Sequence, residues 1–222
     1  MRKAANVCTL DSVLRMPVGL VCGLDEAGRG PLAGPVTAAA AILPADFPMR
    51  LLDDSKRMSA RRREDSYRAI VEGALDWAVG WATVEEIDRS NILVASLRAM
   101  ERAFAGMTQV PALVVVDGIF APNLWMNGTY VEAATMPKAD SLIPAVMAAS
   151  ILAKVARDHL MCRLDDLMPE YGFGRHKGYP TKAHREAIER CGPSRFHRQG
   201  FQLLVQPNSL LFDSFDSEGS ED

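Results

Sequence analysis

Two adjacent acidic residues, Asp25 and Glu26, stand at the end of an apolar run that covers residues 18–24. Two neighbouring carboxylates at the tip of a buried strand are costly unless they are paired or bind a cation. Hard divalent cations such as Mg²⁺ and Mn²⁺ prefer oxygen ligands of this kind. The sequence Gly-Arg-Gly at positions 28–30 follows at once, and such a turn can bring backbone N–H groups and a guanidinium against an anion. The combination indicates phosphodiester chemistry.

Two further acids stand where predicted elements begin or end. Asp117 follows an apolar strand predicted at 112–116 and precedes a glycine. Functional groups of α/β sheets gather at strand ends, and the alternative is a turn-forming Asp-Gly. Asp140 directly precedes a long helix predicted at 141–167, where the alternative role is that of a helix N-cap.

Together the four acids lie on three elements that could converge at one edge of a mixed sheet. Such a cluster would repel itself without cations, and two metal ions roughly 3.5–4 Å apart would neutralise it. Neighbouring residues of a strand point to opposite faces. We therefore expect Asp25 and Glu26 to share one site only if the chain turns at Glu26.

The stretch 23–30 is also close to the nucleotide-binding pattern G-x-x-x-x-G-K-[ST]. The lysine and the hydroxyl residue of that pattern are absent, and two acids would lie inside the phosphate cradle. Charge repulsion therefore argues against nucleotide hydrolysis by this loop.

The composition is that of one soluble globular domain. The chain has 222 residues, of which 48% are hydrophobic and 24% charged. It contains no apolar run of the roughly 18 residues that a membrane span needs, and its N-terminus does not resemble a signal peptide. No C-x-x-C spacing joins the four cysteines, so we expect reduced thiols in a cytoplasmic protein; they are Cys8, Cys22, Cys162 and Cys191.

The net charge of −3 is unevenly distributed. Residues 212–222 hold five acids and no base, and without them the balance is +2. Residues 171–203 hold seven bases against two acids, together with three of the four histidines. This segment predicts a local basic surface that could bind phosphates.

The pattern of the remaining chain predicts alternating strands and helices. We expect an N-terminal extension at 1–17, a catalytic domain with a C-terminal helical part at 18–205, and an acidic, disordered tail at 206–222. The other predicted elements are a hairpin strand at 34–43, a polar loop at 53–56, a helix at 60–73 capped by Ser59, a strand at 75–83, one amphipathic helix at 84–104, a strand near 130–135, and a helix at 181–190 ending at Gly192.

Six motifs closely resemble those of bacterial ribonuclease HII, in the same order along residues 18–201. The first is Gly-Leu-Asp-Glu-Ala-Gly-Arg-Gly-Pro-Leu-Ala-Gly-Pro-Val at 23–36. The others lie at 54–56, 116–118, 138–140, 148–158 and 171–181. The resemblance implies an α/β, ribonuclease H-like fold with a mixed five-stranded sheet flanked by helices and a small C-terminal helical region.

The resemblance also implies a function. Members of this family are endoribonucleases that hydrolyse RNA in RNA/DNA hybrids and at single ribonucleotides embedded in duplex DNA, leaving a 5′-phosphate and a 3′-hydroxyl. The chain is thus expected to act in removing ribonucleotides from DNA, with two Mn²⁺ or Mg²⁺ ions when substrate is bound. The family's metal-binding, catalytic acids fall on Asp25, Glu26, Asp117 and Asp140.

The family's substrate-sensing residues fall on Gly28, Arg29, Gly30 and Tyr179. The Gly-Arg-Gly turn is expected to sense the ribose 2′-hydroxyl, which distinguishes RNA from DNA locally. Tyr179 is expected to stack on the sugar of the following nucleotide, where a deoxyribose fits better than a ribose, with ordinary packing as its alternative.

Several positions match or depart from the family pattern without an assigned role. Lys56 and Ser150 match it, as do Lys154 and Arg157, for which a structural link from helix to sheet and a DNA contact both stay open. Ala139 replaces a common glycine, and the added methyl should be tolerated unless the position needs a positive φ. Gly200 replaces a serine, so we assign it no phosphate contact.

Alternative functions are another acid-cluster nuclease on the same fold, such as a resolvase or exonuclease, and a hybrid-binding module without catalysis. The Gly-Arg-Gly turn argues against the first and the four acids against the second. Residues 206–212 loosely resemble peptides that dock on replication sliding clamps, which suggests a weak clamp contact. We expect no membrane association and a monomer.

Overall fold

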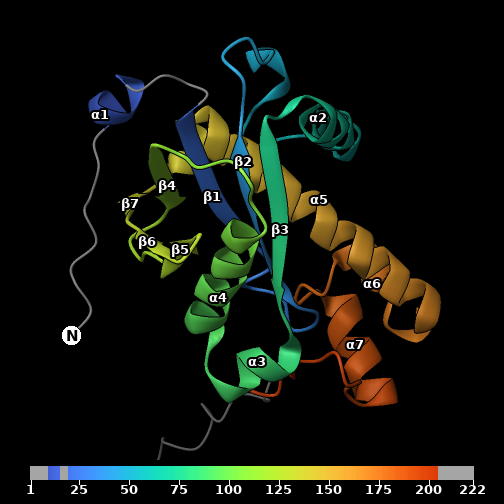
Figure 1. The fold of residues 1–222 in the computed structure, drawn as a ribbon. Helices are drawn as coiled ribbons and strands as arrows, with labels where there is room; N and C mark the ends of the chain where they lie inside the picture. The colour runs from blue at the N-terminus through green and yellow to red at the C-terminus, as the bar shows by residue number, and fades with distance from the viewer. Residues whose placement is uncertain (1–9, 16–19, 205–222) are drawn as a thin grey trace, which may run out of the picture.

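A computed structural model describes residues 10–15 and 20–204 of the chain (Figure 1). Its centre is a five-stranded sheet in the order β3-β2-β1-β4-β7. Strand β2 pairs antiparallel with both β1 and β3, whereas β4 pairs parallel with both β1 and β7. The predicted mixed five-stranded sheet is confirmed. Its strands are β1 (Val21–Ala27), β2 (Val36–Ile42), β3 (Asp76–Ala82), β4 (Leu113–Asp117) and β7 (Ala133–Met136).

Helices cover both faces of the sheet (Figure 1). Helix α4 (Ile92–Ala105) packs on one face, and α5 (Pro144–Leu167) with α2 (Ala60–Gly73) packs on the other. The alanines at 38–41 of β2 are all fully buried and alternate between the two faces. Their small side chains let both helices approach the sheet closely.

Two glycines bring the main chains of the layers into direct contact. A Cβ atom on Gly23 of β1 would overlap the backbone of Ala145 and Val146 at the start of α5. A Cβ atom on Gly80 of β3 would overlap the backbone of Ala99 and Ala103 in α4. The separation of the sheet from each helix therefore depends on the absence of a side chain at these two positions.

The single helix predicted at 84–104 is wrong, because the structure has two helices there, α3 (Val84–Arg89) and α4. The Ser90 hydroxyl donates to the carbonyl of Glu86 at 2.6 Å, and the Asn91 side chain accepts from Val94 N–H at 2.9 Å. These polar side chains end one helix and cap the next, which a continuous apolar periodicity does not reveal.

Two other predicted elements differ from the structure. The helix predicted at 141–167 begins only at Pro144, a residue suited to the first helical turn, and a 3₁₀ turn, η3 (Ala139–Ser141), precedes it. Asp140 lies in that turn and does not cap α5. The strand predicted near 130–135 is divided into β6 (Thr129–Val131) and β7, and β6 forms a hairpin with β5 (Leu124–Met126).

Helix predictions that rested on capping residues are confirmed. Ser59 Oγ accepts from Arg62 N–H at 3.2 Å at the start of α2. Thr181 caps α7 (Lys182–Cys191), which ends at Gly192.

The N-terminal part of the chain contributes one further packed element. Helix α1 (Leu10–Leu14) places Val13 in an apolar cluster with Val21 and Ile143. The predicted acidic tail and the segment compared with clamp-binding peptides lie beyond residue 204, outside the described residues. Within the described ranges, we find no helix with the length and apolar character needed to cross a bilayer.

The substitution Gly23→Ala should destabilise the fold because its methyl group meets backbone atoms that cannot move aside. We expect the free energy of unfolding to fall by about 2 kcal/mol or more, measured by chemical denaturation. The control is Gly73→Ala in the last turn of α2, where the nearest atom to an added Cβ is Phe47 Cε2 at 3.4 Å. That variant should stay within about 0.5 kcal/mol of the unmodified protein. Equal effects of the two substitutions would contradict the packing argument.

Candidate active site

The acids of β1 and β4 lie where these two strands separate. Strand β1 pairs with β4 only as far as Leu24, which lies opposite Val116, so Asp25 and Glu26 extend beyond the paired region. The turn expected at Glu26 is not found, because β1 continues to Ala27. Since no strand of the described chain pairs with this side of β1 beyond Leu24, side chains from both faces can approach the edge at Asp117.

Backbone and side-chain contacts connect the remaining acids to this edge. Asp117 Oδ1 accepts from Ala139 N–H at 2.7 Å, which holds the turn containing Asp140 beside the end of β4. The backbone of Ala139 does not have a positive φ. The position therefore tolerates a methyl group in place of the family's glycine, as predicted. Within this edge, charge repulsion acts between Asp25 and both Glu26 and Asp117, and between Asp117 and Asp140. The structure thus brings the four predicted acids together.

Two cationic side chains partly offset this negative charge. Lys56 Nζ lies 3.0 Å from Asp140 Oδ2, and Arg29 Nη1 lies 3.3 Å from Glu26 Oε1. Burial opposes the charged form of Lys56, but its hydrogen bond to Asp140 and its attraction to the neighbouring carboxylates together outweigh this effect and raise its pKa.

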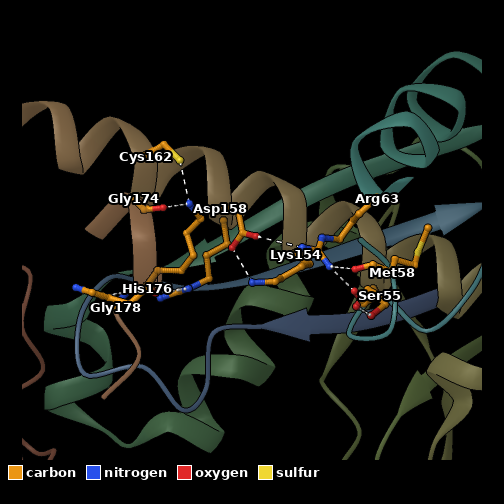
Figure 2. A network of polar contacts seen from close by, with 12 residues as sticks. Ser55, Met58, Arg63, Lys154, Asp158, Cys162, Gly174, His176 and Gly178 are labelled. Carbon is orange, nitrogen blue, oxygen red and sulfur yellow. Dashed lines mark hydrogen bonds and ion pairs between the residues drawn. The ribbon is translucent and has the colours of Figure 1, made fainter. Parts of the chain in front are cut away.

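The loop that carries Lys56 is fixed to both α2 and α5 (Figure 2). Arg63 donates to the carbonyls of Ser55 and Met58, at 2.5 and 3.2 Å. The hydroxyls of Ser55 and Ser150 lie 2.9 Å apart, which links the loop to α5. The sequence identified Lys56 and Ser150 as matching residues; Arg63 was missed, because a helical arginine gives no signal of a loop contact.

The acid cluster remains electrostatically unfavourable. Asp25 is only 4% exposed, and burial, followed by repulsion from Glu26 and Asp117, raises its pKa well above the usual range. Burial also raises the pKa of Glu26, and burial with repulsion from Asp140 raises that of Asp117. A bound cation would relieve both the repulsion and the loss of hydration, so an all-oxygen site for a hard divalent cation fits these residues.

The side chains as they stand do not form a closed metal cage. Among residues 10–15 and 20–204, no group of three or more His, Cys, Asp or Glu side chains is arranged to hold one ion. Magnesium is commonly held by one or two carboxylates together with substrate phosphates. The open arrangement therefore suits ions whose coordination the substrate completes.

The Gly-Arg-Gly turn follows the two acids directly and packs against α5. Gly28 has φ +95°, and a Cβ atom there would overlap the Arg157 side chain. Only glycine therefore fits at this position.

Two buried arginines hold this turn through its backbone. Arg198, which is fully buried, donates to the carbonyls of Gly28, Arg29 and Gly34, at 2.6–2.9 Å. Arg157 donates to the carbonyls of residues 33, 35 and 177, at 2.9–3.0 Å. Burial lowers the pKa of Arg157 to about 10 and, with repulsion from Arg157, that of Arg198 to about 9.

These contacts orient the turn. The C=O and N–H of a trans peptide point in opposite directions. Because the carbonyls of Gly28 and Arg29 face Arg198, the N–H groups of Arg29 and Gly30 face away from it. Arg198 was counted in the sequence only as part of a basic surface, since nothing in its spacing separates a buried arginine from an exposed one.

Tyr179 lies beside the same turn. Its Cε1 is 3.7 Å from the position that a Cβ atom on Gly30 would take, and the residue is 41% exposed. Lys154 Nζ lies 5.9 Å from the centre of the ring and pairs with Asp158 at 2.7 Å (Figure 2). By contrast, Tyr171 is buried and donates to the carbonyl of Gly192 at 2.8 Å, which is a packing role.

Comparisons with known proteins identify the family of this chain. The chain matches the family profile described as Ribonuclease HII over residues 22–204. It is 49% identical over 198 residues to ribonuclease HII of Dechloromonas aromatica, which covers 89% of this chain and 98% of the relative.

Solved structures show the same fold. The crystal structure of ribonuclease H2 from Pyrococcus horikoshii superposes with a TM-score of 0.66 at 27% identity, covering 82% of this chain and 94% of that one. The ribonuclease HII of a PCNA complex from Archaeoglobus fulgidus gives 0.66 at 24% identity, covering 86% and 98%. Bst-RNase HIII in complex with Mn²⁺ gives 0.64 at 19% identity, covering 82% and 65%.

The family match covers most of the chain, and the fold is the ribonuclease H-like fold of these structures. The chain therefore belongs to the ribonuclease HII family of metal-dependent endonucleases, which cleave RNA in RNA/DNA hybrids.

Proposed function

We propose that Asp25, Glu26, Asp117 and Asp140 are the catalytic acids and hold two divalent cations, Mn²⁺ or Mg²⁺, in the complex with substrate. The observation that carries this proposal is the buried, mutually repelling acid cluster around Asp25. A Mn²⁺ complex of a protein with the same fold supports the choice of metal. When bound, such ions supply activation of the attacking water and stabilisation of the leaving 3′-oxygen.

The protein's own residues would position the substrate strand. Arg29 is about half exposed beyond Glu26, and its guanidinium could exchange that carboxylate for a backbone phosphate. The Lys56 side chain, which is largely exposed and pairs with Asp140, could offset the negative charge of this acid before substrate binds. The chain would thus bring the phosphate against the acids without closing the site.

Recognition of the ribonucleotide would rest on the turn beside the acids. The outward N–H groups of Arg29 and Gly30 could bind the 2′-hydroxyl and the adjacent phosphate, with Gly28 permitting the turn. Tyr179, next to Gly30, would stack on the following sugar. This arrangement supports cleavage at single ribonucleotides in duplex DNA as well as in longer hybrids, and hence a role in ribonucleotide removal.

The localisation and the partners are inferred from the cysteines and from a protein with the same fold. In the described chain Cys22, Cys162 and Cys191 are free thiols, which suits a cytoplasmic enzyme acting as a monomer on nucleic acid. A ribonuclease HII of the same fold forms a complex with PCNA. We infer a weak contact of residues 206–212 with a sliding clamp.

Replacing Asp25 or Asp117 by Asn should abolish cleavage of a duplex that carries one ribonucleotide, with a loss of about 1,000-fold or more. The variants should still fold, because each removes an unfavourable negative charge. The rise in unfolding temperature that Mg²⁺ causes in the unmodified protein should also be lost. Asp166→Asn, at an exposed position of α5, is the control and should retain both properties. Retained cleavage in Asp25→Asn would refute the metal assignment.

Replacing Tyr179 by Ala should lower kcat/KM at a single ribonucleotide by about tenfold or more, since an aromatic stacking contact is worth about 1–3 kcal/mol. Tyr179→Phe should restore the value because it retains the ring. The unfolding temperature should change little at this exposed position, whereas Tyr171→Ala should lower it through lost packing. Parallel losses of activity and stability in Tyr179→Ala would instead assign Tyr179 a packing role.

Removing residues 206–222 should abolish retention of the protein on an immobilised sliding clamp while leaving cleavage intact. The measurement is a pull-down with purified clamp. Unchanged retention after truncation would exclude the proposed clamp contact.

A further inference from the structure

Three histidines gather beneath the loop that carries Tyr179. His184 and His197 are buried, with 0% and 3% exposure, and His176 stacks on His184 with ring centres 4.2 Å apart. Phe173 packs edge-on against both His176 and His184. Burial lowers the pKa of all three, that of His184 to about 4, so these rings are neutral near pH 7. Each neutral ring has one donor and one acceptor nitrogen.

A backbone N–H group fixes which nitrogen carries the proton. His197 Nδ1 lies 2.9 Å from the N–H of Ser194, so Nδ1 is an acceptor and the proton is on Nε2. His197 Nε2 lies 3.1 Å from His184 Nε2, which must then accept. The proton of His184 is therefore on Nδ1, which donates to the carbonyl of Tyr179 at 2.9 Å.

The main chain of Tyr179 is held on both sides by this cluster. Its N–H donates to the carbonyl of His176 at 2.9 Å. His176 is itself fixed: its Nδ1 accepts from the N–H of Gly178 at 3.2 Å, and its Nε2 donates to the carbonyl of Tyr171 at 2.8 Å. The Tyr179 carbonyl also accepts from Thr181 N–H at 2.8 Å. His176 and Gly178 appear beside α5 in Figure 2.

We infer that His184 is a positioning residue for recognition of the ribonucleotide: its Nδ1–H holds the Tyr179 carbonyl, and the chain Ser194–His197–His184 sets the direction of that bond. The inference rests on the proposed role of Tyr179. The ring is exposed and meets the substrate, whereas its direction is determined by main-chain bonds made in the interior. Without the bond from His184, the Tyr179 carbonyl retains only the bond from Thr181, and the ring no longer keeps one orientation beside Gly30.

Amide side chains separate this role from simple packing. The amide nitrogen of Asn can take the place of Nδ1, and that of Gln the place of Nε2. His184→Asn therefore keeps the donor to Tyr179, whereas His184→Gln keeps the contact with His197 and loses that donor. At His197 the pattern reverses: His197→Gln keeps the donor to His184, and His197→Asn keeps only the acceptor for Ser194.

The experiment measures kcat/KM of each variant on a duplex with one ribonucleotide and on an all-RNA/DNA hybrid, below the unfolding temperature of every variant. We expect His184→Gln and His197→Asn to lower the ratio of the two values by about tenfold, the typical effect of one lost hydrogen bond. His184→Asn and His197→Gln should keep the ratio within about twofold. The control His159→Gln, at a half-exposed histidine of α5, should leave it unchanged.

The crossed pattern distinguishes the outcomes. If the ratio follows the loss of unfolding temperature irrespective of Asn or Gln, the histidines only fill space and the inference is overturned. If the two His184 variants fail to fold, the two His197 variants still test the crossed pattern, and the reverse also holds. A lowered ratio in Tyr179→Ala with an unchanged ratio in His184→Gln overturns this inference alone. An unchanged ratio in Tyr179→Ala overturns the proposed role of Tyr179 and the inference together.

Discussion

The recognition side of the active site depends on two buried guanidinium groups. The hydrogen bonds of Arg157 and Arg198 within the described chain all end on backbone carbonyls, and those carbonyls belong to the loop after β1 and to residue 177. Two charges buried in this way are costly, and the many bonds they make offset the cost. These bonds direct the N–H groups of Arg29 and Gly30 outward, and the Leu32 N–H donates to the carbonyl of Gly178, which holds the Tyr179 segment against the loop.

Two of the acids, Asp25 and Glu26, precede the same loop in the chain, and the acid cluster follows a different physical rule. They repel one another, and the cationic side chains of Lys56 and Arg29 reduce that repulsion. In the proposed function the acid cluster would stabilise bound cations rather than the fold, whereas the arginines stabilise the loop rather than the chemistry. One short segment, from Asp25 to Gly30, joins the two functions.

Sequence patterns predicted most of this arrangement, and the failures have identifiable causes. Strong apolar runs and capping residues such as Ser59 and Gly192 correctly placed strands and helices, because their effect is local. The break at Ser90 and Asn91 was missed because the apolar periodicity continues across it. Asp25, Glu26 and Asp117 were singled out because they stand at strand ends and Asp140 because it precedes a helix, and their metal-binding role stays a prediction. The buried roles of Arg198 and His184 were not, since burial of a polar residue depends on contacts distant in the sequence.

The two glycine contacts between the layers have a consequence for how such a protein can vary. A contact between main-chain atoms has the same dimensions whatever side chains surround it. Gly23 and Gly80 therefore make the spacing between sheet and helices a fixed length, independent of the volumes of neighbouring residues. Changes elsewhere in the interior can alter how space is filled while α5 keeps its distance from β1, which carries Asp25 and Glu26, and α4 keeps its distance from β3.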